Sequence, residues 1–294
     1  MQFKSIGNRK QQTIIAVAAS AILALAATAL NHPVFFAAAG LAPLAVIGVL
    51  RAPLALVLGF AVFSFFRIHE VFPALYPLHI PQWLALGALA SLAWEIWSRR
   101  TSIYWSRELA MFSFFFAVVT IGVFFATNRP EAWATWSGTY VKIGIMTFAL
   151  AWLMRTPEAF RAAIRIIIAA GILIGLVALH NKINGIGLVE GTRVTIGREI
   201  GSMLGDPNDL ALVLLFPAAF TLAVFLSPNE SKWARIFAVA GFVTVFSAII
   251  ATQSRGGLMG ITAVMGTFAW RRVPNKGILI AVAAVALVIL FAFA

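Results

Sequence analysis

The sequence predicts an all-α, polytopic protein built from transmembrane helices. Apolar side chains make up 62% of its 294 residues and charged side chains only 11%, whereas soluble domains are nearer half apolar and a quarter charged. Mean hydropathy is +0.95. Long apolar runs such as residues 109–126 match the roughly 20 residues that cross a hydrocarbon core. These observations exclude cytosolic enzymes and nucleic-acid-binding modules, and the absence of cysteine excludes disulfides, thiolate catalysis and Cys-ligated zinc.

Eleven apolar segments are candidate spans of a single transmembrane domain over residues 1–294. The first is interpreted as a retained helix because it is long for a signal peptide and no clear cleavage site follows it. Two segments, 54–66 and 256–270, are short and need their flanks or tilt to cross a bilayer. No internal repeat or low-complexity linker divides the chain. The segments are residues 13–30, 34–50, 54–66, 82–98, 109–126, 138–154, 163–180, 208–227, 236–252, 256–270 and 277–294.

The positions of basic residues predict that the N-terminus is cytoplasmic. With that orientation, 15 of the 22 basic residues fall in cytoplasmic connections, as the positive-inside rule expects. The connection 181–209 and all four histidines then lie on or near the outer side, so any chemistry is expected to be extracytoplasmic. The 15 are Lys4, Arg9, Lys10, Arg51, Arg99, Arg100, Arg107, Arg155, Arg161, Arg165, Lys232, Arg235, Arg271, Arg272 and Lys276.

The outer loop 181–209 is the longest polar stretch between spans, and its end has the pattern of a helix start. Asp206 is the expected N-cap, Pro207 suits the first helical position, and Asp209 falls in the first turn with Asn208. This pattern alone is equally consistent with a membrane helix that is only well capped.

A second polar cluster, residues 252–257, connects two spans on the same side. One interpretation is a tight turn in which Gly256 and Gly257 supply unusual backbone angles and Arg255 reaches the headgroups. The other starts from charge: Arg193, Arg198 and Arg255 lie in two outer connections that bracket one pair of spans. These connections are expected to lie close together. Guanidinium groups facing one cavity would suit a diphosphate, whose oxygens they bind bidentately.

The remaining polar residues carry weaker signals. Arg67 and Glu70 are spaced as an ion pair at a helix end. The histidines have no spacing typical of metal ligands, so no metal site is predicted. Trp133 and Trp136 are interpreted as part of an interfacial aromatic belt more than as a platform for a sugar.

Residues 198–211 (REIGSMLGDPNDLA), followed by residues 254–257 (SRGG), resemble the O-antigen ligase and polymerase superfamily. The shared pattern is an arginine, a glycine three residues later, an Asp/Asn-Pro-Asn sequence that opens a membrane helix, and later a Ser-Arg-Gly turn. The resemblance covers about residues 198–260. It implies a GT-C-like membrane glycosyltransferase of the bacterial inner membrane that uses no cofactor.

By this resemblance, glycan is transferred or polymerised from an undecaprenyl-diphosphate carrier onto a lipid, polysaccharide or protein acceptor at the periplasmic face, among membrane lipids. Arg198 and Arg255 would contact the diphosphate, joined by Arg193 on the charge argument. Asp206, Asn208, Asp209 and Ser254 would organise the site. The family's base lies in a large periplasmic loop, which is expected beyond residue 294; within the chain, His180 is a weak candidate. These 294 residues alone are then expected to bind without turnover.

Two other functions are consistent with the sequence. A transporter or flippase of lipid-linked glycan would also need basic residues in a cavity, but such proteins usually show repeats and broken helices near the midplane. Neither feature is evident in this sequence. A non-catalytic membrane subunit is the third possibility.

Overall fold

The computed structural model describes residues 14, 17–18, 21–22 and 46–293. Most of the predicted spans 13–30 and 34–50, and the basic N-terminal residues, lie outside these described residues. Within them the chain is all-α, as predicted, and the β-type pairing found there is a single isolated bridge between Val189 and Arg193.

Each predicted span from residue 54 onward contains a helix. The elements in chain order are α3 (Pro53–Phe65), α4 (Ile68–Val71), η1 (Pro73–Leu78), α5 (Ile80–Trp97), α6 (Arg107–Phe125), α7 (Arg129–Thr135), η2 (Trp136–Tyr140), α8 (Val141–Leu153), α9 (Pro157–Asn184), η3 (Arg198–Ile200), η4 (Met203–Gly205), α10 (Pro207–Leu226), α11 (Lys232–Thr252), α12 (Arg255–Arg272) and α13 (Lys276–Phe293).

Short polar side chains begin seven of the α-helices. Each accepts a hydrogen bond from a backbone N–H in the first turn of the helix that follows: Ser106, Asn128, Thr156, Asp206, Ser231, Ser254 and Asn275. These N-caps satisfy donors that have no partner within the helix. These short polar side chains therefore mark where the helices start.

Four helices in the part of the chain that the structure describes are long and apolar enough to cross a membrane: α6, α9, α10 and α11. The surface of α6 is apolar as well, since Phe114 and Phe125 are 74% and 82% exposed. Large exposed apolar side chains on a helix of this length are suited to contact with lipid. The length and composition of these four helices are consistent with a membrane protein.

The chain forms two compact units, Met1–Ala61 with Pro81–Ala159, and Val62–Ile80 with Phe160–Ala294. The single transmembrane domain stays a prediction. In the first unit, Val57 and Phe60 of α3 pack with Ala88 and Leu92 of α5 and Ala149 of α8. The second unit has a larger core, in which the most deeply buried side chains include Ile174, Leu210, Leu214, Val245 and Ile249.

Close helix contacts in the second unit depend on small residues. A Cβ atom at Gly171 of α9 would lie 2.2 Å from Cβ of Pro217 in α10, and one at Gly257 of α12 would lie 2.5 Å from Cβ of Ala211 in α10. Such close approach between helices is typical of packing in membranes.

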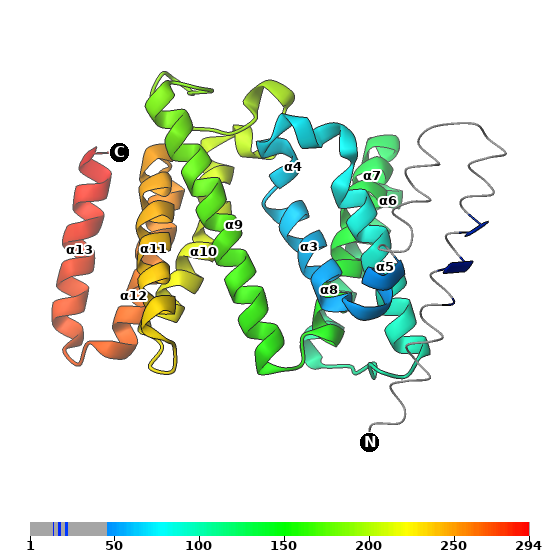
Figure 1. Cartoon of the computed structure of the whole chain (residues 1–294). Coiled ribbons are helices and arrows are strands. Elements are labelled where there is room, and N and C mark those ends of the chain that lie inside the picture. Colours follow the sequence, from blue (N-terminus) through cyan, green and yellow to red (C-terminus); the bar gives the residue numbers. More distant parts are fainter. Residues whose placement is uncertain (1–13, 15–16, 19–20, 23–45, 294) are drawn as a thin grey trace. The chain divides into compact units, whose positions relative to one another are not determined.

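The connections of the second unit gather at two ends, as Figure 1 shows. One end, which we call the loop end, comprises Arg67 with α4, residues 180–209 and residues 252–257. The other, the turn end, comprises residues 160–165, 227–235 and 270–277. The candidate site predicted from sequence lies wholly at the loop end.

Candidate functional site

The connection that follows α9 folds back on itself at the loop end. Val189 and Arg193 exchange two backbone hydrogen bonds of 2.9 Å. Between them, Glu190 and Gly191 both have positive φ, 53° and 74°. Two successive left-handed residues are typical of the type I′ turns that reverse a hairpin. The turn directs the next residues back toward the helices.

The middle of this connection is buried and attached to its neighbours. Val194 and Thr195 are fully buried. The backbone N–H of Val194 donates to the carbonyl of Ala251 in α11 at 3.2 Å, and the Asn181 side chain donates to the carbonyl of Thr195 at 3.0 Å. The loop therefore has a fixed path between α9 and the end of α11.

Two 3-10 turns then place Arg198 beside the start of α10. Gly197 and Gly201, with φ of 66° and 69°, flank η3, which contains Arg198. Gly205 packs against this turn: a Cβ there would lie 2.9 Å from Cα of Arg198. Gly205 directly precedes Asp206, so Arg198 and the α10 N-terminus are close neighbours.

The predicted start of α10 is confirmed. Asp206 Oδ1 accepts from the backbone N–H groups of Asn208 and Asp209, at 2.7 and 3.3 Å, and Pro207 is the first helical residue. The carboxylates of Asp206 and Asp209 both lie where the helix dipole favours negative charge. They also reduce the positive charge that this helix end presents to an anion.

The turn 252–257 differs from the glycine-based turn considered from sequence. Gln253 has the positive φ, 51°, and ends α11, whereas Gly256 and Gly257 lie inside α12. The turn is stabilised by side chains instead: Ser254 Oγ accepts from the N–H of Gly257 at 3.1 Å, and Thr252 Oγ1 accepts from the N–H of Ser254 at 3.2 Å. Gly257 is required for the close approach of α12 to α10.

Arg193 joins the two connections, which therefore lie close together as predicted. Its Nη2 donates to Asn208 Oδ1 at 3.0 Å, and its Nε donates to the carbonyl of Thr252 at 3.3 Å. One guanidinium thus links the hairpin, the first turn of α10 and the last residue of α11. Part of its hydrogen-bonding capacity is used within the protein.

The other two arginines are exposed. Arg198 makes no side-chain hydrogen bond or ion pair with any residue that the structure describes. Arg255 is the first residue of α12, three residues after the Thr252 carbonyl that Arg193 contacts. Arg198 packs against Gly205 just before α10, and Arg193 contacts both Asn208 in α10 and Thr252, which lies three residues before Arg255. The three arginines therefore lie on segments that contact one another.

His180, the weak candidate base, lies near the end of α9. Its side chain is exposed, and its Nδ1 lies 3.3 Å from the amide nitrogen of Asn184. The same amide donates to the His180 carbonyl at 2.8 Å. This contact holds the imidazole beside the Asn184 side chain on the helix.

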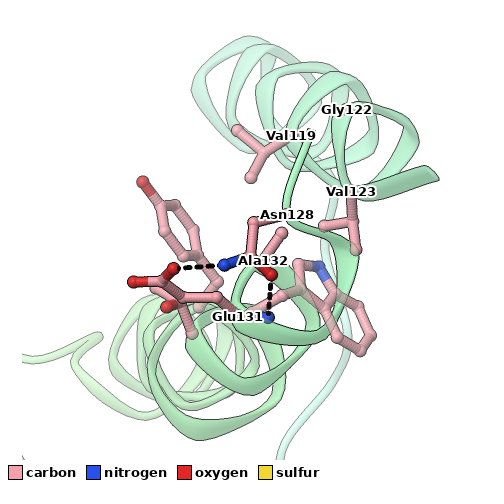
Figure 2. Close-up of a pocket in the computed structure, with 9 residues that line it drawn as sticks. Val119, Gly122, Val123, Asn128, Glu131 and Ala132 are labelled. Atoms are coloured by element: carbon pink, nitrogen blue, oxygen red, sulfur yellow. Dashed lines mark hydrogen bonds between the residues drawn. The ribbon is translucent and has the colours of Figure 1, made fainter. Parts of the chain in front are cut away.

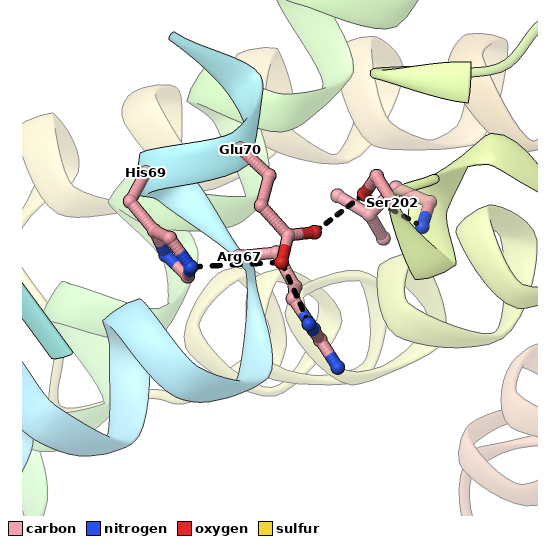
Figure 3. A network of polar contacts seen from close by, with 5 residues as sticks. Arg67, His69, Glu70 and Ser202 are labelled. Carbon is pink, nitrogen blue, oxygen red and sulfur yellow. Dashed lines mark hydrogen bonds and ion pairs between the residues drawn. The ribbon is translucent and has the colours of Figure 1, made fainter. Parts of the chain in front are cut away.

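A buried carboxylate supports the loop from the side of α4, as Figure 3 shows. Glu70 is 7% exposed. It accepts from Arg67 Nη1 at 2.6 Å and from Ser202 Oγ at 2.6 Å. The Arg67–Glu70 ion pair matches the spacing seen in the sequence, whereas nothing in the sequence indicated Ser202.

His69 belongs to the same cluster. Its Nε2 lies 3.5 Å from Glu70 Oε1. Burial lowers the pKa of His69, with a smaller lowering from Arg67, and Glu70 opposes both by raising it. The neutral imidazole is therefore the favoured form beside the loop.

A separate pocket lies in the first unit, between α6 and the segment α7–η2. Its volume is about 410 Å³, and Figure 2 shows Val119, Gly122 and Val123 on one side with Asn128 and Glu131 on the other. Asn128 Nδ2 donates to Glu131 Oε2 at 2.8 Å, so the N-cap residue of α7 and an acid of its first turn are paired with each other.

The two tryptophans of this connection are stacked. The Trp133 and Trp136 rings lie 5.1 Å apart, and Trp136 also lines the pocket. The interfacial belt stays a prediction for these two residues.

In comparisons with known proteins, no protein-family model, curated protein or solved structure matches the chain.

Proposed function

We propose that this protein is a membrane glycosyltransferase of the O-antigen ligase and polymerase type, with a GT-C-like bundle of about eleven spans in the bacterial inner membrane. Its loop end would face the periplasm and bind the diphosphate of an undecaprenyl-diphosphate-linked glycan. The observation that carries the proposal is the contiguity of Arg198, Arg193 and Arg255 with the N-termini of α10 and α12. Guanidinium groups favour phosphate oxygens, and so does the N-terminus of α12, which has no acidic residue in its first turn.

The three arginines would have different roles. Arg198 and Arg255 are exposed and suited to bidentate contact with the diphosphate. Arg193 contacts Asn208 and Thr252, so it would hold the two connections together and offer its remaining N–H groups to the ligand. Asp206 and Ser254 would fix the two helix starts.

The reaction would break the bond between the anomeric carbon and the diphosphate oxygen as an acceptor hydroxyl forms the new glycosidic bond. Negative charge develops on the departing diphosphate, and fixed arginines that stabilise this charge would lower the barrier. The acceptor hydroxyl must lose its proton to a base, whose absence costs about 10²–10⁴ in rate. His180 is the weak candidate for that base within the described residues.

Binding of undecaprenyl diphosphate to the purified protein in nanodiscs tests the diphosphate site. Removing a charge-assisted contact costs about 1.5–3 kcal/mol, or roughly 10- to 150-fold in affinity. We expect Arg198→Ala and Arg255→Ala to weaken binding in this range, and Arg→Lys to remain impaired because an ammonium lacks the planar fork. Arg271→Ala, at the turn end, is the control. Near-normal binding by the Arg198→Ala/Arg255→Ala double variant would reject the site.

A second assay separates the enzyme from a flippase, since both would bind the same donor. Lipid-linked oligosaccharide and an acceptor are supplied to the protein in vesicles. Transfer of the glycan to the acceptor supports the enzyme. Movement of the intact donor between leaflets without transfer would support the flippase instead.

A further inference from the structure

A crevice of about 260 Å³ lies at the turn end of the second unit. It is formed by α9, α10 and α11, three of the helices that are long and apolar enough to cross a membrane. Its wall is apolar, with Ile164 and Ile168 from α9, Val224 from α10 and Phe237 and Ala238 from α11.

The rim of this crevice is basic. Arg161 and Arg165 both line it and stand four residues apart, so they lie on one face of α9. The Arg165 side chain is 68% exposed, and its Nη2 lies 3.9 Å from Glu230 Oε2, the acidic group of the rim. An ion pair of that length with a mostly exposed arginine is weak, so the Arg165 guanidinium can bind another anion. Glu158 lies one turn before Arg161 on the same helix.

Other basic residues at the turn end form hydrogen bonds with backbone carbonyls of the protein. Arg235 donates to the carbonyls of Ser227 and Pro228 at 2.8 and 2.9 Å, and Arg272 donates to the carbonyl of Leu226. These contacts satisfy carbonyls at the C-terminus of α10 and just beyond it. Arg165 makes no such contact with a carbonyl of the described chain, so its charge has no evident role in capping a helix.

We infer that this crevice is a binding site for an anionic phospholipid, with the phosphate against Arg165 and Arg161 and part of an acyl chain against the apolar wall. A soluble anion would use the rim but leave the apolar wall in water, whereas a lipid covers both. The position at the end of three spanning helices is where headgroups lie, and basic pockets between such helices are typical sites for anionic lipids. This inference does not depend on the proposed glycan transfer.

Lipid binding to the whole protein is measured directly, by native mass spectrometry and by thermal stabilisation in detergent. Phosphatidylglycerol is the anionic probe, phosphatidylcholine the zwitterionic one, and glycerol phosphate represents the headgroup without chains. We expect phosphatidylglycerol to bind and stabilise the protein more than phosphatidylcholine does, with no competition from glycerol phosphate. Equal binding of the two lipids would overturn the inference, and competition by glycerol phosphate would assign the rim to soluble anions.

Variants locate the site. An arginine near an anionic surface contributes about five-fold in affinity, so Arg161→Gln/Arg165→Gln should lose roughly 25-fold for phosphatidylglycerol. Arg271→Gln, at the same end but outside the crevice, is the matched control. Glu230→Gln should bind more tightly, because it removes the competing carboxylate. Ala234→Leu fills the crevice and should weaken binding while both arginines remain. Wild-type affinity in the double variant would reject this crevice.

Discussion

The two ends of the second unit contain the same kinds of charged residue and use them differently. The loop end has as many acids as bases: Arg67, Lys182, Arg193, Arg198 and Arg255 against Glu70, Glu190, Glu199, Asp206 and Asp209. The turn end is strongly basic, with Arg161, Arg165, Lys232, Arg235, Arg271, Arg272 and Lys276 against Glu230.

The difference follows from the length of the connections. The turn end has short connections, so its arginines reach the carbonyls that end α10. The loop end must fix a long connection across several helices. There, Arg193 and Glu70 each contact two segments at once. An arginine is therefore informative about function only when its partners are known.

The largest expected effect concerns which side of the membrane each end faces. The chain has no cysteine, so single cysteines can be labelled cleanly. Glu190, Gln253 and Pro274 are exposed. In spheroplasts, an impermeant maleimide should label Glu190→Cys and Gln253→Cys but not Pro274→Cys, because the end with fewer basic residues is expected outside. The reverse pattern would invert the proposed topology.

A second prediction compares two glycines of α12, one near each end. Gly257→Ala would place its Cβ 2.5 Å from Cβ of Ala211, whereas a Cβ at Gly266 has nothing within 4 Å. Overpacking costs about 1–3 kcal/mol, while Gly→Ala in an open helix position gains up to about 1 kcal/mol. Thermal unfolding in detergent should therefore shift in opposite directions. A stabilised Gly257→Ala would show that α10 and α12 are not closely packed.

A third prediction compares the acids. Glu70→Gln removes a buried charge that accepts from Arg67 and Ser202, and a lost charged hydrogen bond costs about 1.5–3 kcal/mol. Glu230→Gln breaks a 3.9 Å pair with an exposed Arg165 and should change stability by less than about 1 kcal/mol. Thermal unfolding of both variants checks the contrast. Equal effects would mean that the α4 contact does not support the loop.

Local features of the site could be predicted from the sequence. Asp206 and Pro207 specify the start of α10 because an N-cap depends on neighbours within three residues. The approach of the connections 181–209 and 252–257 could also be predicted, since they are consecutive connections on one side of the predicted bundle. The all-α class follows from the apolar composition and the length of the apolar runs.

Long-range features could not be predicted in this way. Ser202 and Glu70 are 132 residues apart, and their pairing depends on how α4 packs against the loop. The division into two compact units has no signal in composition. Gln253 was missed as the residue with positive φ because two glycines follow it, and their role in helix packing is visible only once Ala211 is placed.

The smallest expected effect is the pH dependence of the loop end. Because burial lowers the pKa of His69 below its ordinary value of 6.5, the folded protein binds fewer protons there than the unfolded chain. The stability that depends on neutral His69 is then complete above pH 6.5 and is lost as the pH falls through the lowered pKa. Between pH 7.5 and 5.5, above the range in which ordinary carboxyl groups titrate, the wild-type unfolding temperature should fall more than that of His69→Gln. The turn end has no histidine among its residues. The difference between the wild type and His69→Gln in how the unfolding temperature changes with pH therefore reports on the loop end. If both lose the same stability over this interval, protonation of His69 does not weaken the contact between α4 and the loop.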